Sequence, residues 1–99
     1  MKEKISKMKI TIKLLKPFSN AVGKNELDLD FNGSTLKDLI NILIDKFPKL
    51  KKELYEKNDE LTDYVCIFVN DKPIAALNEM NTELKNNDEI LFFMPVSGG

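Results

Sequence analysis

The stretch STLKDLINILIDKF (34–47) is the clearest structural signal in the sequence. Its apolar residues recur with the period of an α-helix, at positions 36, 39, 40, 43 and 47. Thr35 is followed three residues later by Asp38, which is the spacing of a capping box, and Pro48 ends the pattern. The stretch therefore predicts one amphipathic helix, and such a helix needs a surface on which to bury its apolar stripe.

Two segments with strand-like alternation precede this helix. MKITIKLLK (8–16) alternates apolar residues with lysine and threonine, and NELDLDF (25–31) alternates apolar residues with acidic ones. Alternation with a period of two is typical of a strand that has one buried face and one wet face. Pro17 and Gly23 mark the connection between the two segments, so we expect a hairpin.

The sequence after the helix contains mainly strand signals. KLKKELYEKNDEL (49–61) predicts one short helix at most, whereas DYVCIFVN (63–70) is rich in residues that favour strands. NDK (70–72) predicts a turn into PIAAL (73–77), which we expect to be a short strand. EILFFM (89–94) is apolar on both faces, as in a strand in the middle of a sheet, although a partner could cover one face.

The predicted order is strand, strand, helix, strand, short strand, strand. This order favours an α+β fold, in which one main helix packs on a mixed sheet of four to five strands in the β-grasp arrangement. The last strand would lie centrally beside the first and parallel to it. We expect a disordered N-terminal extension over 1–7, one domain over 8–94 and a flexible tail over 95–99. Met8 could serve as an alternative start.

The composition argues against several classes of function. The 15 basic residues are all lysines, and 16 acidic residues balance their charge. Because the chain has no arginine, it cannot make bidentate contacts to guanine or phosphate. We therefore expect no nucleic-acid partner. With no histidine and one cysteine, the chain has no residues for an imidazole or thiolate metal cluster or a catalytic triad. We expect Cys66 to be a small buried hydrophobe. No apolar run approaches membrane-spanning length, so we expect no membrane partner and a cytoplasmic location.

The chain ends in FFMPVSGG (92–99), a pattern that predicts a chemical use for the terminus. Pro95 has no backbone N–H, so strand pairing on that side stops there. The tail from Met94 to Gly99 could reach roughly 20 Å when extended. Because the two final glycines have no side chain, the Gly99 carboxylate would be accessible to an ATP phosphate and then to a second nucleophile. The alternative is a frayed end that happens to finish in glycine.

Several segments resemble the MoaD/ThiS family of ubiquitin-like sulfur carrier proteins. The resemblance covers residues 8–99 and is closest to the MoaD branch, the small subunit of molybdopterin synthase, in the variant common in archaea. The segments that carry it are MKITIKLL (8–15), VGKNELDLDF (22–31), TLKDLINIL (35–43), VCIFVNDKPI (65–74) and DEILFFMPVSGG (88–99). Two departures stand out: Met94 replaces a proline that is usual in the family, and PFSN (17–20) replaces its Leu-Arg-Glu.

The resemblance implies a ubiquitin-like β-grasp fold and a specific use of Gly99. An E1-like adenylyltransferase of the MoeB/ThiF type would adenylate the Gly99 carboxylate with ATP, and the acyl-adenylate would become a thiocarboxylate. The tail would then enter a large subunit of the MoaE type, where the sulfur passes to a pterin precursor of molybdenum or tungsten cofactor. The carrier itself would bind no cofactor and supply no catalytic side chain, so it would not be an enzyme alone.

The resemblance also assigns roles to the residues near the end of the chain. Gly99 would bear the acyl-adenylate and the thiocarboxylate. Contacts with partner proteins would come from Leu91, Phe93, Met94, Pro95, Val96, Ser97 and Gly98. Alternation along the last strand predicts that Ile90 and Phe92 face the core, with Leu91 and Phe93 on the other side. That apolar pair would be an interaction site if exposed, and the alternative is a strand buried on both faces.

Other functions are compatible with the same residues. A sulfur carrier could serve thiamine synthesis, tRNA thiolation or cysteine synthesis, although the proline before the tail favours the molybdopterin branch. A ubiquitin-like modifier would be joined through Gly99 to lysines of other proteins, by chemistry that begins in the same way. A plain binding module would use the sheet face and leave the tail passive.

Overall fold

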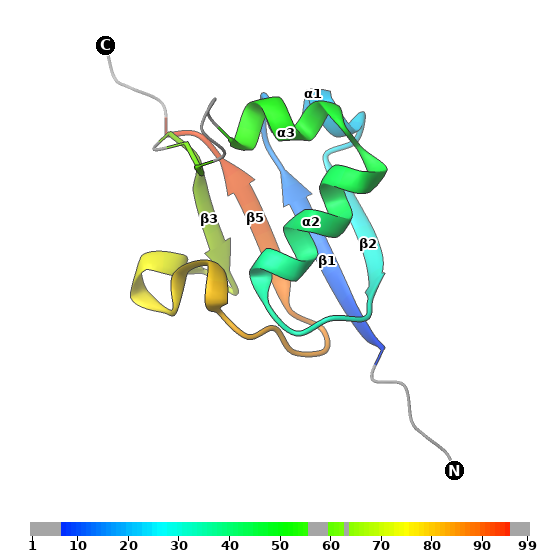
Figure 1. Ribbon diagram of the computed structural model, residues 1–99, viewed down its shortest axis with the longest axis vertical. Coiled ribbons are helices and arrows are strands. Elements are labelled where there is room, and N and C mark those ends of the chain that lie inside the picture. Colours follow the sequence, from blue (N-terminus) through cyan, green and yellow to red (C-terminus); the bar gives the residue numbers. More distant parts are fainter. Residues whose placement is uncertain (1–6, 56–59, 63, 96–99) are drawn as a thin grey trace.

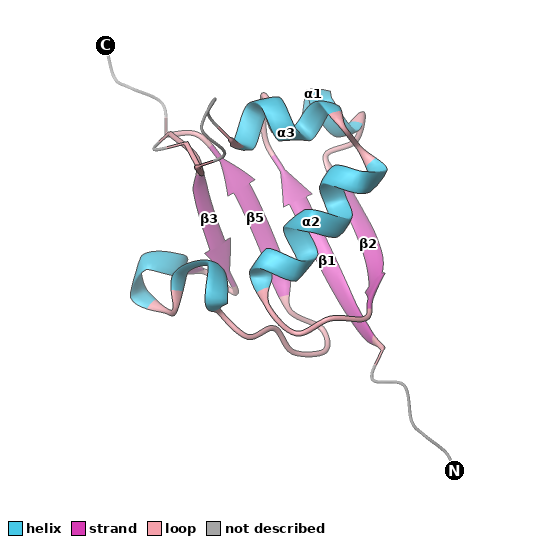
Figure 2. Ribbon diagram, in the orientation of Figure 1, coloured by secondary structure: helices cyan, strands magenta, loops and turns pink. Residues whose placement is uncertain are grey.

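The computed structural model describes residues 7–55, 60–62 and 64–95. A mixed sheet of five strands forms one layer, and helices pack across one face of it (Figures 1 and 2). The strands are β1 (Met8–Leu14), β2 (Glu26–Phe31), β3 (Cys66–Val69), β4 (Lys72–Pro73) and β5 (Glu89–Phe93), in the spatial order β2-β1-β5-β3-β4. β5 lies between β1, to which it is parallel, and β3, to which it is antiparallel. The predicted α+β arrangement with a central last strand is confirmed.

The first two strands form the predicted hairpin and pair antiparallel along the sheet. Their connection is more structured than expected, because it contains a short helix, α1 (Phe18–Val22), that the sequence did not indicate. Phe18 accounts for the helix, since its side chain is fully buried and its ring centroid lies 6.2 Å from that of Phe92. Gly23 ends α1 with a φ of 88°, a conformation that favours glycine.

The main helix, α2 (Leu36–Lys46), begins as the sequence predicts. The Asp38 N–H donates to Thr35 Oγ1 at 3.3 Å, and the Thr35 N–H donates to Asp38 Oδ2 at 3.1 Å, which completes the capping box. The Ser34 N–H donates to the same carboxylate oxygen at 3.0 Å. These backbone hydrogen bonds, from Ser34 and then from Thr35, hold the pKa of the Asp38 carboxyl below its usual value.

The core lies between α2 and the sheet. The predicted short helix is α3 (Lys49–Leu54), which follows Pro48 directly and extends the helical layer. The strands contribute one set of inward side chains, and α2 and α3 contribute the apolar stripes that cover them. The buried apolar residues of these strands and helices are Ile10, Ile12, Leu14, Leu29, Phe31, Leu36, Leu39, Ile40, Leu43, Leu50, Leu54, Ile67, Val69, Ile90 and Phe92. Every second residue of β1, β2, β3 and β5 therefore faces the helices.

The turn between β3 and β4 is tied to the start of β5. Asn70 and Asp71 have φ values of 51° and 71°, a left-handed conformation that asparagine and aspartate adopt more readily than most residues. Asn70 Nδ2 donates to Asp88 Oδ1 at 2.7 Å, and the Glu89 N–H donates to Asn70 Oδ1 at 2.9 Å. The predicted turn is confirmed, and its side chains also fix the point at which β5 begins.

The expectation of a strand over residues 73–77 is wrong. β4 contains only Lys72–Pro73, and the chain then forms a 3₁₀ turn, η1 (Ile74–Ala76). Ile74 is buried whereas the following residues are exposed, so no alternating pattern is present to pair with β3. A second 3₁₀ turn, η2 (Glu79–Asn81), interrupts the predicted loop that leads to β5.

Candidate functional site

The C-terminal end of the described chain leaves the centre of the sheet. The Leu15 N–H donates to the Phe92 carbonyl oxygen at 3.0 Å on one side of β5, and β3 pairs with β5 on the other side. Met94 packs partly against the core, and Pro95 is the last residue described. The predicted tail residues Val96, Ser97, Gly98 and Gly99 lie outside the described residues. Whatever follows Pro95 is therefore attached to a strand that is hydrogen-bonded on both edges.

β5 has one buried face and one partly exposed face. Ile90 and Phe92 are fully buried, whereas Leu91 and Phe93 point to the opposite side and stay partly accessible. The described helices lie on the side of Ile90 and Phe92 (Figure 1). The predicted orientation of these residues is confirmed, and the alternative of a strand buried on both faces is wrong.

A pair of residues on β3 enlarges this accessible surface. In the register of the sheet, Cys66 lies opposite Phe93, and Phe68 lies opposite Leu91. The rings of Phe68 and Phe93 pack at a centroid distance of 5.4 Å with an interplanar angle of 46°. We call Cys66, Phe68, Leu91 and Phe93 the outer patch. It lies at the end of the sheet from which the chain continues to Pro95.

The expectation that Cys66 is buried is wrong, because its side chain is partly exposed in the outer patch. Ile67 and Val69 are the core residues of β3, so Cys66 and Phe68 must face the other way. The period-two rule that orients β5 could have identified this pair. It was missed because the run VCIFV is apolar throughout and shows no alternation.

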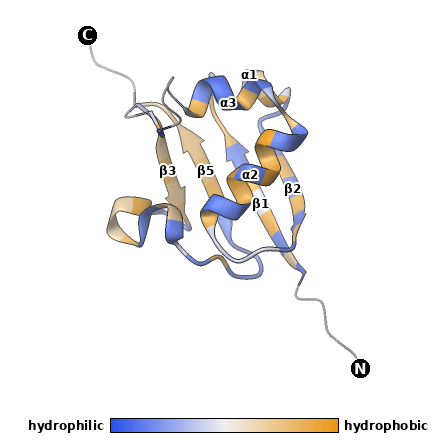
Figure 3. Cartoon of the chain, in the orientation of Figure 1, coloured by the Kyte–Doolittle hydropathy of each residue, from blue (hydrophilic) through white to orange (hydrophobic). Residues whose placement is uncertain are grey.

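The other half of the same sheet face is charged. β1 and β2 direct Lys9, Thr11, Lys13, Glu26, Asp28 and Asp30 to this side. Lys13 forms an ion pair with Glu89 beside the outer patch; the hydrogen bond and the negative charge of Glu89 raise the pKa of Lys13. Figure 3 shows this division, since β3 and β5 are hydrophobic along their length whereas β1 and β2 carry hydrophilic positions. The outer patch is thus an apolar surface with a charged border.

Neither a metal cluster nor a membrane-spanning helix is found in the described part of the chain. Residues 7–55, 60–62 and 64–95 contain no group of three or more cysteine, aspartate or glutamate side chains that could hold a metal ion. In the same part of the chain, no helix has the length and apolar character needed to cross a membrane. The arrangement offers an apolar docking surface next to a firmly held exit strand.

Comparison with known proteins identifies the family. The model of the ThiS family matches residues 12–99, which include the end of β1 and all of β2, α2 and β5. The chain belongs to the ThiS family. A protein of Archaeoglobus fulgidus that is provisionally named a sulfur carrier is 27% identical over 90 residues, covering 91% of this chain and all of that protein.

Solved structures agree with this assignment. The small archaeal modifier protein 1 of Methanosarcina acetivorans is 35% identical with a TM-score of 0.80, and the match covers 94% of this chain and 98% of that one. A Pyrococcus furiosus protein provisionally named molybdopterin converting factor subunit 1 is 26% identical with a TM-score of 0.69, covering 90% and 99%. The fold is therefore the ubiquitin-like β-grasp, and the relatives bear the names of small carriers and modifiers.

Proposed function

We propose that this protein is a sulfur carrier that donates sulfur from a thiocarboxylate on Gly99 to build the dithiolene of molybdenum or tungsten cofactor. The observation that carries the proposal is the position of β5. This central strand of a ThiS-family fold runs directly into a sequence that ends in Gly98 and Gly99. A carboxylate attached to such a strand can be presented at a fixed place relative to a docked enzyme.

The proposed loading of Gly99 with sulfur has two steps and uses no side chain of this protein. The Gly99 carboxylate attacks the α-phosphate of ATP in an E1-like adenylyltransferase of the MoeB/ThiF type, which forms an acyl-adenylate and releases pyrophosphate. Hydrosulfide supplied by a sulfur donor then attacks the acyl carbon and displaces AMP, which leaves the thiocarboxylate. ATP is thus a substrate of the partner enzyme, and the carrier binds no cofactor of its own.

The outer patch supports a docking role both in the loading of Gly99 and in the later transfer of its sulfur. Leu91 and Phe93 are apolar, partly exposed and located where the chain leaves the sheet. Exposed apolar clusters on small proteins commonly mark protein interfaces, and aromatic residues carry much of the binding energy there. We propose that Leu91, Phe93, Met94 and Pro95 contact the adenylating enzyme and a large subunit of the MoaE type, with Val96, Ser97 and Gly98 threaded into the active site.

A second candidate function is supported by the 35% identity to a small archaeal modifier protein. In this role Gly99 is adenylated in the same way, but its acyl group is transferred to a lysine amine of another protein and forms an isopeptide bond. The two functions share the outer patch and the first chemical step. They differ in the nucleophile that finally receives the acyl group or its sulfur.

The test is mass spectrometry of the intact protein after incubation with ATP, an E1-like enzyme and a sulfur donor. We expect the mass change that corresponds to one sulfur replacing one oxygen, located at the C-terminus. A variant that lacks Gly99 should show no change, and omission of ATP should have the same effect. A carrier that gains no sulfur under conditions in which a known family member does would contradict the proposal. Isopeptide-linked conjugates recovered from cells would favour the modifier function.

A further inference from the structure

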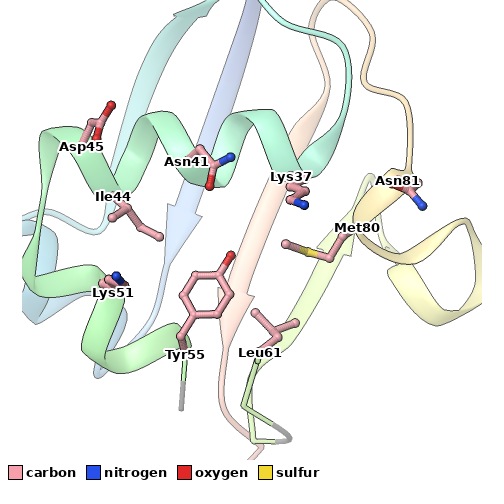
Figure 4. A pocket seen from close by; sticks show the side chains of 9 residues that line it. All are labelled: Lys37, Asn41, Ile44, Asp45, Lys51, Tyr55, Leu61, Met80 and Asn81. Atoms are coloured by element: carbon pink, nitrogen blue, oxygen red, sulfur yellow. The ribbon is translucent and has the colours of Figure 1, made fainter. Parts of the chain in front are cut away.

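A groove lies on the helical layer, on the side of the molecule away from the outer patch. It has a volume of about 680 Å³ and is open to solvent between α2, the end of α3 and η2 (Figure 4). The residues that line it are Lys37, Asn41, Ile44, Asp45, Lys51, Tyr55, Leu61, Met80 and Asn81. A volume of this size is typical of sites that bind a ligand. Neither the tail chemistry nor the outer patch uses any of these residues.

The floor of the groove is apolar and supported from below. Ile44, Tyr55, Leu61 and Met80 are partly buried and pack against the core. Tyr55 and Leu61 are held together by an isolated β-bridge, and η2 packs against α2 and so places Met80 at one wall. Figure 4 shows the Tyr55 ring and the Leu61 and Met80 side chains directed into the same space. An apolar side chain of a ligand can therefore be buried without a rearrangement of the fold.

The rim of the groove is polar and contains more lysine than acid. Lys37, Asn41 and Asp45 follow one another at four-residue spacing along α2 and form one wall. The charged residues of the lining are Lys37 and Lys51 against one acid, Asp45, so the lining carries a net positive charge. Figure 4 shows Lys37 at the end of α2 nearest to Met80. Lys37 forms no ion pair with any residue that the structure describes. The groove therefore offers a cation at the end of α2, next to its apolar floor.

We propose that this groove binds a short peptide segment of a partner protein, in which a bulky apolar residue stands next to an acidic residue. The apolar side chain lies on Tyr55, Leu61 and Met80, and the carboxylate pairs with Lys37. The amides of Asn41 and Asn81 can donate hydrogen bonds to the peptide backbone and accept them from it. A rigid apolar ligand would leave these two amides without a partner. Methionine suits such a site because its flexible side chain adapts to different apolar residues.

This site is independent of the proposed sulfur-carrier function. It lies on the helical layer, whereas the outer patch lies on the uncovered sheet face, so a partner on one leaves the other accessible. A protein with both surfaces could be held by a peptide of one partner while an enzyme acts on its C-terminus. Loss of sulfur transfer would leave the groove intact, and loss of peptide binding would leave the tail intact.

The test is a titration of the ¹⁵N-labelled full-length protein with a panel of capped hexapeptides, followed by NMR. Each peptide carries leucine, methionine, phenylalanine or tyrosine next to a glutamate, in either order. We expect saturable shifts of the side-chain amide signals of Asn41 and Asn81 and of the backbone signal of Met80. Replacing glutamate by glutamine in the tightest peptide should weaken binding about threefold to fivefold, as expected for a partly exposed ion pair.

Two variants of the protein test whether Lys37 pairs with the acidic residue of the peptide. K37Q should bind the glutamate and glutamine peptides equally, because the pairing partner is gone. K46Q changes a lysine at the end of the same helix that does not line the groove, and it should keep the threefold to fivefold difference. Absence of saturable shifts with the whole panel would overturn the proposal. So would shifts centred on Phe93, or a K37Q protein that still distinguishes the two peptides.

Discussion

The two faces of β5 are built from the same kinds of side chain, yet they have different surroundings. Ile90 and Phe92 lie under the helices and are fully buried. Leu91 and Phe93 alternate with them on the same strand and face the side that the described helices leave uncovered. Folding alone buries the first pair, which stabilises every molecule, whereas the second pair is fully buried only when a partner protein covers it. An apolar strand can therefore serve stability with one face and recognition with the other.

This difference also explains why the strand is apolar on both sides. A strand that only closed a core would be expected to carry polar residues on its wet face, as β1 and β2 do with lysines and acids. The outer patch instead keeps two aromatic rings in contact at a partly exposed position. Such a surface costs solubility, and a binding function offsets that cost. Substitutions at neighbouring residues of β5 can test whether the two faces differ in this way.

The largest expected effect comes from the buried face. Phe92→Ala removes a fully buried ring that packs with Phe18, and it should lower the free energy of unfolding by about 3–5 kcal/mol. Phe93→Ala removes an identical side chain from the accessible face and should cost clearly less. Urea unfolding followed by circular dichroism measures both. Equal losses for the two variants would show that the faces of β5 do not differ in the way described.

The next effect concerns recognition rather than stability. Phe93→Asp places a charge in the outer patch, where an interface would otherwise bury an aromatic ring, and it should weaken binding to the adenylating enzyme by about tenfold or more. Thr11→Asp, on the charged half of the same sheet face, is the matched control and should change affinity much less. Surface plasmon resonance gives both affinities. A full-affinity Phe93→Asp protein that is still folded would exclude the outer patch as the docking surface.

Most of the fold can be predicted from the sequence because the capping and turn residues agree with the periodicity of the apolar residues. The capping box at Thr35 and Asp38 coincides with the start of an apolar stripe, and period-two alternation marks β1 and β2 without ambiguity. The helix α1 escaped prediction because five residues after a proline carry too little periodicity. The failure of the strand over 73–77 has a similar cause, since a short apolar run looks alike in a strand and in a 3₁₀ turn.

The candidate site was predictable only in part. Leu91 and Phe93 were assigned from alternation and from the family resemblance, whereas Cys66 and Phe68 join them through strand pairing between distant segments. The groove on the helical layer combines residues from α2, from the end of α3 and from η2, which no local pattern connects. A resemblance can locate a terminus that reacts, but a surface assembled from three segments requires the packed structure.

A third prediction tests how closely the helical layer fits the sheet. A Cβ atom added at Gly33 would lie 2.7 Å from Phe31 Cζ, closer than Cβ atoms approach other heavy atoms in proteins, and a tight 3.0 Å from Asp38 Cβ. Gly33→Ala should therefore lower the free energy of unfolding by about 1–3 kcal/mol. Gly23→Ala is an informative comparison, because that site has open space but a φ of 88°. A Gly33→Ala protein as stable as the wild type would show that this side of the molecule is loosely packed.

The smallest effect concerns the start of α2 and depends on pH. The backbone hydrogen bonds from Ser34 and Thr35 favour the ionised Asp38 carboxylate in the folded protein, so its folded pKa is lower than its unfolded value. The resulting stabilisation is complete above the unfolded pKa, near pH 4, and is lost as the pH falls through the lower folded pKa. Asp38→Asn should therefore reduce the urea midpoint at neutral pH, and its difference from the wild type should shrink in acid.

Asp45→Asn provides the matched control for this pH dependence, since Asp45 is an exposed aspartate on the same helix outside the capping box. Its urea midpoint should differ little from that of the wild type at either pH. The urea midpoints of Asp38→Asn and the wild type could instead differ by the same amount in acid and at neutral pH. That result would mean that the lost stability comes from packing and not from the ionised cap. The ion pair between Lys13 and Glu89 on the other face of the sheet differs from this cap, because it is exposed and borders the outer patch instead of starting a helix.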